Sequence, residues 1–274
     1  MVTTSQGLKG KVAIVTGAAR GNGRGIAVRL AKDGATVIAV DICAQIESIK
    51  YRLASQDDLA ESARLITKAG GEAVQIVGDV RDRDAMQKVA SEAIDRFGAI
   101  DIVVANAGIT PFGPIVPGTD PFKDSIDVML TGVYNVVDSA IPHIISGGRG
   151  GSIVVISSTA GLRGLADVSP GTIGYGAAKH GVVGLMRNWA KGLGKHNIRA
   201  NTVHPTGCET PAVMSPEFQS YYAANKAVMV SMENVLPVSM LQPEDLAECV
   251  YFLCSDAGRF ITGQTVAFDA GATL

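Results

Sequence analysis

The sequence predicts an α/β fold with a doubly wound, seven-stranded parallel sheet and helices on both faces. Seven short runs are apolar and rich in β-branched residues without alternation, as in strands buried on both faces. Segments of helical periodicity lie between them, which is the order that produces right-handed crossovers between parallel strands. The chain has 274 residues, 47% of them hydrophobic, and we expect one domain over residues 1–274.

The elements follow one another in strict alternation. A strand at residues 12–15 runs into glycines, and the helix after it places Ile26 and Leu30 on one face and ends at Gly34. The clearest later helix covers residues 86–97, with apolar residues at i, i+3, i+4, i+7, i+8 and i+11. The other strands are expected at residues 36–40, 73–77, 100–105, 152–156, 198–203 and 265–268.

Two segments break this alternation, and a polar stretch precedes it. Residues 1–9 form a polar stretch that we expect to be a flexible tail. Residues 42–56, called the insert below, and residues 208–242, called the substrate segment, are too short to be domains. Because ligands of doubly wound sheets bind at the carboxyl ends of the strands, we expect both segments to be loops or small helices over that crevice.

Composition favours chemistry on a small molecule. The 24 basic and 26 acidic residues leave a net charge of -2, and no run of like charges indicates a nucleic-acid partner or a membrane surface. No apolar stretch reaches the roughly 18 to 20 residues that span a bilayer. The four cysteines show no C-x-x-C pair, and the start lacks the pattern of a signal peptide. We expect a soluble, cytoplasmic protein.

The first strand is followed by a turn that suits a dinucleotide. It reads Thr16-Gly17-Ala18-Ala19-Arg20-Gly21-Asn22-Gly23, and its glycines let the backbone approach a pyrophosphate at a helix start. Asp41 ends the second strand, 18 residues after Gly23, where a carboxylate binds the adenosine ribose hydroxyls. The same charge repels the 2′-phosphate of NADP, which favours NAD. Arg20 opposes this interpretation, because a base in the turn attracts that phosphate.

A second set of residues suits proton transfer. Ser158 follows the fifth strand, and Tyr175 and Lys179 stand at i and i+4 of a predicted helix, so they share one face. A tyrosine near pKa 10 is a poor base at neutral pH, but an adjacent ammonium and a positively charged nicotinamide favour the phenolate. Ser158 can then bond the substrate oxygen while Tyr175 takes its proton and a hydride leaves the carbon.

These motifs together resemble the short-chain dehydrogenases/reductases, from about Lys9 to the end of the chain. The resemblance implies a Rossmann-type fold, a homotetramer and the catalytic residues Ser158, Tyr175 and Lys179. It also implies that Asp79 and Val80 contact adenine, that Asn106 stabilises the sheet, that Lys179 holds the nicotinamide ribose and that Thr210 bonds the carboxamide. The full set of implied cofactor-binding residues is Gly17, Arg20, Gly21, Asn22, Gly23, Asp41, Asp79, Val80, Asn106, Ala107, Gly108, Tyr175, Lys179, Pro205, Gly207 and Thr210.

Finer features resemble an actinobacterial subgroup related to carveol dehydrogenase. They are Val40-Asp41-Ile42-Cys43 before the long insert, Val203-His204-Pro205-Thr206, and the tail from residue 260 to residue 271. This resemblance implies a mycofactocin-type redox carrier as a partner and a nicotinamide cofactor that is held without exchange. The insert is then expected to act as the lid over the adenosine half.

One position departs from the family. Met129 stands where the family has its catalytic asparagine, and a thioether neither donates a hydrogen bond nor accepts one well. The water relay behind Lys179 is therefore in doubt, and Asn135, two helical turns away, is a poor substitute. His204, Cys208 and Glu209 are too closely spaced on one loop to match a metal polyhedron, so we expect no metal site.

The substrate segment predicts an apolar pocket for a terpenoid, alicyclic or steroid-like alcohol. Its large apolar residues are Met214, Phe218, Tyr221, Tyr222, Met229, Met232 and Met240, although any one of them can equally pack on the sheet or on a neighbouring subunit. Two alternatives stay open: an NADPH-dependent ketoreductase, against which Asp41 argues, and a nucleotide-sensing protein without catalysis, which would be expected to have lost the acid/base pair.

Overall fold

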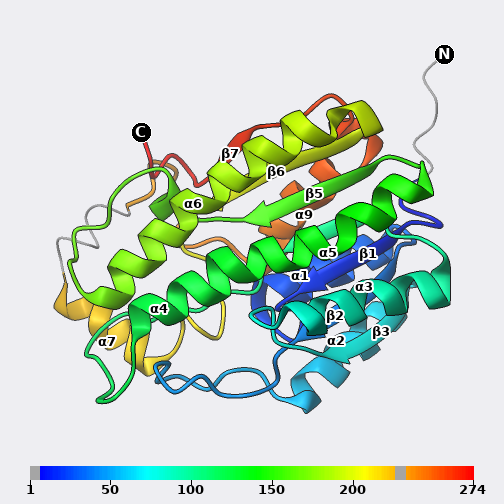
Figure 1. The fold of residues 1–274 in the computed structure, drawn as a ribbon. Coiled ribbons are helices and arrows are strands. Elements are labelled where there is room, and N and C mark those ends of the chain that lie inside the picture. Colours follow the sequence, from blue (N-terminus) through cyan, green and yellow to red (C-terminus); the bar gives the residue numbers. More distant parts are fainter. Residues whose placement is uncertain (1–6, 226–232) are drawn as a thin grey trace.

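The sheet has seven parallel strands in the order β3-β2-β1-β4-β5-β6-β7 (Figure 1), which confirms the predicted fold class. The computed structural model describes residues 7–225 and 233–274. The strands are β1 (Val12–Thr16), β2 (Thr36–Asp41), β3 (Glu72–Val77), β4 (Ile102–Ala105), β5 (Gly151–Ile156), β6 (Ile198–Pro205) and β7 (Thr265–Phe268). The strand order reverses direction between β1 and β4, which is where sheets of this type bind their ligands.

Helices cover both faces of the sheet. Figure 1 shows α3, α5 and α6 in front of it and α1, α2 and α9 behind it. The α-helices are α1 (Gly21–Lys32), α2 (Gln56–Lys68), α3 (Arg83–Phe97), α4 (Pro121–Ile126), α5 (Gly132–Gly147), α6 (Pro170–Leu193), α7 (Pro216–Ala224) and α9 (Pro243–Cys254). Shorter turns are η1 (Asp127–Thr131), η2 (Thr159–Gly161), η3 (Gly194–His196) and η4 (Asp256–Gly258).

Each central strand supplies residues to two separate cores. Val12 and Ile14 of β1 pack with the helices on one face, and Ala13 and Val15 pack with those on the other. Successive side chains of a strand point to opposite faces, so a strand covered on both sides needs apolar residues at every position. This requirement is why the strands appear in the sequence as continuous apolar runs.

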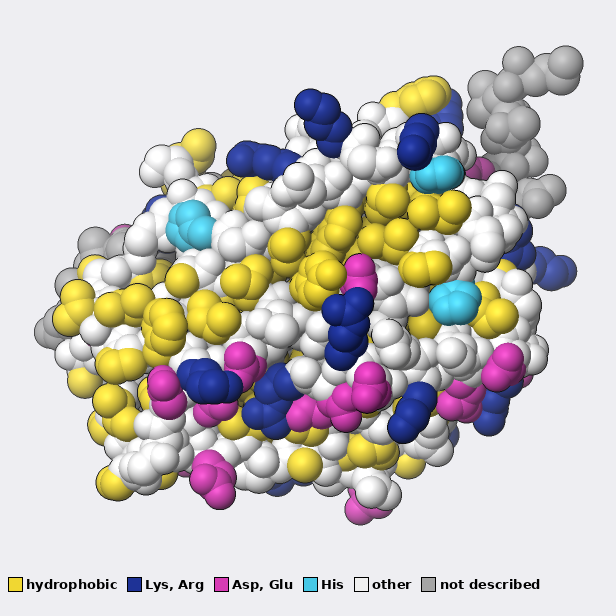
Figure 2. Space-filling view, viewed as in Figure 1, with side chains coloured by type: hydrophobic (Ala, Val, Ile, Leu, Met, Phe, Trp, Pro, Cys, Tyr) yellow, Lys and Arg dark blue, Asp and Glu magenta, His cyan; other side chains and the backbone are white. Residues whose placement is uncertain are grey.

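The segment Pro121–Gly147 corrects one expectation. α4, the π-helical η1 and α5 form a continuous helix that is long and apolar enough to cross a membrane by length and composition, the only such helix among the described residues. This differs from the expectation that no apolar stretch of the sequence reaches that length. Half of its most apolar stretch is buried inside the protein, as in the core helix of a globular domain. Part of its outer surface joins the apolar side chains seen over α5 and α6 in Figure 2.

Residues 7–9 also correct an expectation, because they are not part of a flexible tail. Leu8 is only 2% exposed and packs in the core that contains α1 and α9. Its backbone N–H donates to the Asp33 carbonyl oxygen (2.9 Å), and its carbonyl accepts from Lys11 N (3.0 Å). Residues 1–6 of the predicted tail lie outside the described residues.

We predict that Leu8→Ala lowers the free energy of unfolding by about 2–3 kcal/mol, because it removes buried methyl groups and leaves a cavity. Urea unfolding monitored by circular dichroism would measure this. Lys9→Ala, which changes an exposed neighbour, is the control and should shift stability by less than about 0.5 kcal/mol. Equal stability of the two variants would show that residues 7–9 behave as a tail after all.

Candidate active site

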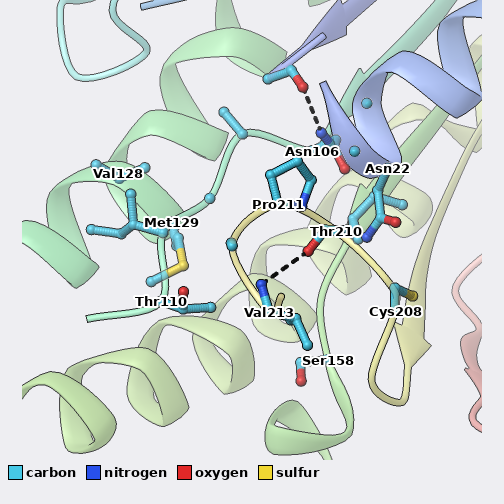
Figure 3. Close-up of a pocket in the computed structure, with 18 of the residues that line it drawn as sticks. Asn22, Asn106, Thr110, Val128, Met129, Ser158, Cys208, Thr210, Pro211 and Val213 are labelled. Carbon is cyan, nitrogen blue, oxygen red and sulfur yellow. Dashed lines mark hydrogen bonds between the residues drawn. The ribbon is translucent and has the colours of Figure 1, made fainter. Parts of the chain in front are cut away.

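A cavity of about 500 Å³ lies at the carboxyl ends of β1, β2, β4, β5 and β6. Figure 3 shows side chains from the glycine-rich turn, the β4 end, η1 and the substrate segment around this one space. Every catalytic and cofactor-binding residue named from the sequence lines it, although those residues come from seven separate parts of the chain. The parallel sheet brings them together because all its strands end at the same edge.

The glycine-rich turn packs too closely for side chains. Gly17 has φ of 65°, and a Cβ added there would lie 2.8 Å from Ala107 Cα. A Cβ on Gly23 would lie 1.9 Å from the Gly17 carbonyl oxygen. Asn106 fixes this turn to the end of β4, since its Nδ2 donates to the Thr16 carbonyl oxygen (2.9 Å).

The start of α1 is the part of this turn that suits a phosphate. No side chain in the described part of the chain caps the first turn of α1. Its backbone N–H groups therefore stay available to an anion, and the helix dipole favours negative charge at this end. The turn accordingly fits the pyrophosphate of a dinucleotide.

Asp41 and Arg20 line the end of the cavity next to β2. Asp41 is buried, and its Oδ2 accepts from Ala19 N (3.0 Å). Burial raises the pKa of Asp41, while the bond from Ala19 and the charge of Arg20 lower it. The Arg20 guanidinium lies 6.0 Å from the centre of the Tyr51 ring, so it is next to the insert. Its positive charge also acts on the carboxylate of Asp41. Asp79, farther along the wall, accepts hydrogen bonds from Arg81 Nε.

The insert is an ordered loop that lines this cavity. Its residues Ile46, Tyr51, Leu53 and Ala54 are all buried and all face the same space. The side chain of Gln45 connects three parts of the loop. Its Nε2 donates to the Ile49 carbonyl oxygen (2.6 Å), and its Oε1 accepts from Leu53 N (3.0 Å). Residues 42–55 form a loop, one of the two forms expected for this segment, and α2 begins at Gln56.

Two hydrogen bonds join the insert to the opposite wall. Tyr51 Oη accepts from Thr110 N (3.0 Å), and Ser48 Oγ donates to Asp124 Oδ2 (2.5 Å). Thr110 follows the Asn106-Ala107-Gly108 segment at the end of β4, and Asp124 belongs to α4. The insert therefore extends from the end of β2 to the β4 side of the cavity.

Ser158, Tyr175 and Lys179 meet at the end of β5. Lys179 Nζ donates to the Ile156 carbonyl oxygen (2.8 Å) and lies 5.6 Å from the centre of the Tyr175 ring. Burial lowers the pKa of Lys179 to about 8, so it is mostly protonated at neutral pH. Burial raises the pKa of Tyr175, and a hydrogen bond with Ser158 opposes that shift. The protein alone therefore holds Tyr175 as a phenol, and a further positive charge is needed to make it a base.

Met129 occupies the wall where the family has its asparagine. Its side chain is fully buried within η1, and a Cβ added to Gly108 would lie 3.6 Å from its Sδ. Asn135 does not line the cavity, as expected: its Nδ2 donates to the Val80 carbonyl oxygen (3.0 Å). Met129 has no amide, and the amide of Asn135 is bonded to Val80, so neither residue replaces the family's asparagine beside Lys179.

An aromatic wall closes the other end of the cavity. The Phe112 ring packs edge-on against Tyr175, with centroids 5.2 Å apart, and contacts Phe218 at 5.9 Å. Phe218 stacks on Tyr222, and Met240 also lines the space. Three residues of the predicted apolar set therefore face the cavity. Met214 is 51% exposed instead, and Met229 and Met232 lie outside the described residues.

Tyr221 differs from the rest of that set because its hydroxyl serves a structural bond. It donates to Asp167 Oδ2 (2.5 Å), which also accepts from Thr172 Oγ1 (2.6 Å) and Ser169 Oγ (2.7 Å). Burial would raise the pKa of Asp167, but these hydrogen bonds outweigh it and lower the pKa to about 2. This carboxylate fastens α7 to the loop before α6.

The sequence did not single out Tyr51, Phe112 or Asp167. Tyr51 and Thr110 are 59 positions apart, and Tyr221 and Asp167 are 54 apart. A local pattern cannot connect such residues. Phe112 gave the one usable signal. It is an aromatic residue shortly after the Asn106-Ala107-Gly108 segment, and this position could have marked it as part of a pocket wall.

Two of the three possible metal ligands named from the sequence, His204 and Cys208, are engaged elsewhere. His204 Nδ1 lies 2.8 Å from the Ser158 carbonyl oxygen, and its Nε2 lies 2.8 Å from Thr202 Oγ1. Both ring nitrogens thus face protein groups. Burial raises the pKa of the Cys208 thiol to about 12, so it stays protonated, whereas metals bind the thiolate.

Comparison with known proteins finds relatives that match nearly the whole chain. Residues 17–273 match the family model described as enoyl-(acyl carrier protein) reductase. An uncharacterized oxidoreductase of Mycobacterium tuberculosis is 51% identical over 265 residues, 96% of each chain. The (-)-trans-carveol dehydrogenase of Rhodococcus erythropolis is 40% identical, covering 97% of this chain and 99% of its own.

A solved structure supports the comparison in three dimensions. Carveol dehydrogenase from Mycobacterium avium, in complex with NAD, has a TM-score of 0.89 and 40% identity, covering 98% of this chain and 99% of its own. These matches agree with the fold and with the glycine-rich turn described above. The chain belongs to the short-chain dehydrogenase/reductase family of oxidoreductases.

Proposed function

We propose that the chain is an NAD-dependent dehydrogenase that moves a hydride between a secondary alcohol, or its ketone, and nicotinamide. One observation carries the proposal: Ser158, Tyr175 and Lys179 line the same cavity as Asp41 and the glycine-rich turn. The similar carveol dehydrogenase and a similar short-chain dehydrogenase from Mycobacterium paratuberculosis were both solved with NAD, which supports the same cofactor here.

The residues of the chain divide the chemistry between them. Bound NAD would supply the hydride acceptor and a positive charge beside Tyr175. The Ser158 hydroxyl then donates to the substrate oxygen and fixes its place, while Tyr175 accepts the proton of the alcohol. Lys179, held on the Ile156 carbonyl oxygen, keeps an ammonium near the developing phenolate. In the reverse direction the same tyrosine returns the proton to the ketone oxygen.

The two alternatives fit these residues less well. An NADPH-dependent ketoreductase would place a 2′-phosphate against the buried carboxylate of Asp41, while Arg20, the base that could attract it, contacts the Tyr51 ring. A nucleotide sensor without catalysis would have no use for Tyr175, Lys179 and Ser158 in one cavity. The experiments on Tyr175 and Asp41 described below test both alternatives.

The substrate end favours an apolar, ring-shaped alcohol. Phe112, Phe218, Tyr222 and Met240 supply its wall, beside the proton acceptor Tyr175. A terpenoid, alicyclic or steroid-like alcohol matches such a wall better than a sugar or a charged acid. The 40% identity to a carveol dehydrogenase supports the same class.

The insert supports a cofactor that is retained between turnovers. It lines the adenosine end of the cavity and is joined to Thr110 and Asp124 across it. A dinucleotide under such a loop leaves slowly, so its electrons must pass to a second acceptor. We propose that a mycofactocin-type redox carrier is that partner.

We also propose a cytoplasmic homotetramer. Tyr134 of α5, Ile173 of α6 and Phe122 of α4 are exposed. Figure 2 shows apolar side chains gathered over the layer of α5 and α6, a surface that a second copy would cover. The four cysteines are all free thiols, as expected in a reducing compartment.

We predict that Tyr175→Phe lowers kcat for a cyclic terpenoid alcohol such as carveol by at least about 100-fold, because it removes the proton acceptor but little volume. The Kd for NAD should stay within about threefold, since the phenyl ring still packs on Phe112. Steady-state kinetics and calorimetry would measure the two effects. More than a tenth of the wild-type activity in this variant would refute the proposed role.

We predict that Asp41→Ala weakens NAD binding by about 1.5–3 kcal/mol, which is the usual value of hydrogen bonds to a charged group. The difference between the affinities for NAD and NADP should become smaller. Titration of cofactor-free protein with each nucleotide would measure both. Asp57→Ala, an exposed carboxylate of α2 that does not line the main cavity, should leave both affinities unchanged. A wild-type preference for NADP would contradict our interpretation of Asp41.

We predict that protein purified without added nucleotide carries NAD(H), turns over poorly with free NAD and reduces an artificial electron acceptor. Native mass spectrometry would identify the bound nucleotide. Tyr51→Phe removes the acceptor of Thr110 N and should speed nucleotide exchange by about 2- to 10-fold. Lys50→Ala, an exposed neighbour in the insert, should not. Rapid multiple turnover with free NAD alone would argue against retention.

A further inference from the structure

The side chain of His204 is enclosed within the protein on the β6 side of the active site. It is 0% exposed, and each ring nitrogen lies 2.8 Å from one oxygen: Nδ1 from the Ser158 carbonyl and Nε2 from Thr202 Oγ1. A carbonyl oxygen can only accept a hydrogen bond, so Nδ1 carries the proton. In the neutral ring Nε2 then accepts from the Thr202 hydroxyl. The two contacts together assign one tautomer.

The surroundings of the ring keep it neutral. Burial lowers the pKa of His204; the bond to Ser158 and the charge of Asp269 raise it, while Lys179 and His180 lower it further. A neutral imidazole with a fixed proton is a directed donor. Its acceptor is the carbonyl oxygen of Ser158, the serine that faces the substrate in the proposed function.

Ser158 lies just past the last backbone bond of the sheet. Ser157 N donates to the Val203 carbonyl oxygen (2.8 Å), and beyond it the chain turns into η2. Within that turn Ser158 Oγ accepts from Ala160 N (3.2 Å), and the Ser158 carbonyl oxygen accepts from Gly161 N (2.8 Å). His204 adds a bond to this carbonyl from another strand, so it ties the serine to the body of the sheet.

We propose that His204 is a positioning residue that fixes the Ser158 peptide and thereby aims the Ser158 hydroxyl at the substrate oxygen. The inference rests on the proposed function, in which Ser158 acts on the substrate. A shift of the Ser158 backbone that this bond prevents would carry Cβ and Oγ with it and change the position of Oγ relative to Tyr175. Misplacement of a reacting group by about 1 Å costs on the order of 100-fold in rate, which sets the scale of the expected effect.

The test compares His204→Leu with Thr202→Val. Leucine fills much of the space of the ring but gives Ser158 no donor, whereas Thr202→Val removes the partner of Nε2 and leaves the bond to Ser158 intact. We expect His204→Leu to lower kcat by about 10- to 100-fold, with KM and the Kd for NAD within about threefold. We expect Thr202→Val to keep kcat within about threefold. A merely structural histidine would make the two variants lose kcat alike.

A second pair of variants covers the case in which His204→Leu does not fold. The amide nitrogen of asparagine can take the place of Nδ1, whereas the longer glutamine places its amide near Nε2. We therefore expect His204→Asn to recover kcat to within about fivefold of wild type and His204→Gln to remain as low as the leucine variant. In ¹⁵N-histidine spectra of the wild type, Nδ1 should carry the proton.

Ser158→Ala, measured in parallel, distinguishes a failure of the proposed function from a failure of the proposed role of His204. Full activity in that variant would overturn the proposed function and this inference with it. Loss of activity in Ser158→Ala with unchanged kcat in His204→Leu, or with equal kcat in the asparagine and glutamine variants, would overturn the inference alone.

Discussion

The site depends on a constraint of the sheet: every strand is parallel, so every carboxyl end lies at one edge. The loops that leave this edge carry the glycine-rich turn, Asp41, Asn106 and Ser158, and the sheet order places β1 next to β4 at the point of reversal. Helices cover both faces, which leaves this edge as the place where polar groups can meet a ligand. Asn106 then joins the ends of β1 and β4 through the Thr16 carbonyl.

The features that follow from this constraint could be predicted from the sequence. Continuous apolar runs marked strands such as β1 and β5, and fixed spacings marked Gly17, Tyr175 and Lys179. The contacts that close the cavity could not be predicted. The bonds of Tyr51 with Thr110 and of Tyr221 with Asp167 join residues more than 50 positions apart and depend on where loops cross in space. Leu8 was missed for a related reason, since one apolar residue in a polar stretch has no periodicity.

Met129 shows how one side chain changes the polar character of this site. It is wholly buried between η1 and the Gly108 backbone, so apolar packing replaces the amide that the family places there. Lys179 keeps its bond to the Ile156 carbonyl oxygen and has a pKa of about 8. Its ammonium therefore stays oriented by β5 rather than by η1. Proton exchange with solvent must then use groups other than the side chain at position 129.

The two ends of the cavity are closed by different kinds of interaction. In the insert, Ile46, Ile49, Tyr51 and Leu53 are buried in the main core, so opening it would expose several apolar side chains. In α7 only Tyr221 is buried, and one carboxylate holds it. Segments that bury little apolar surface open at lower free energy than segments built into a core. The substrate end should therefore open more readily than the cofactor end, an order that suits the proposed function, in which alcohols exchange while the dinucleotide stays bound.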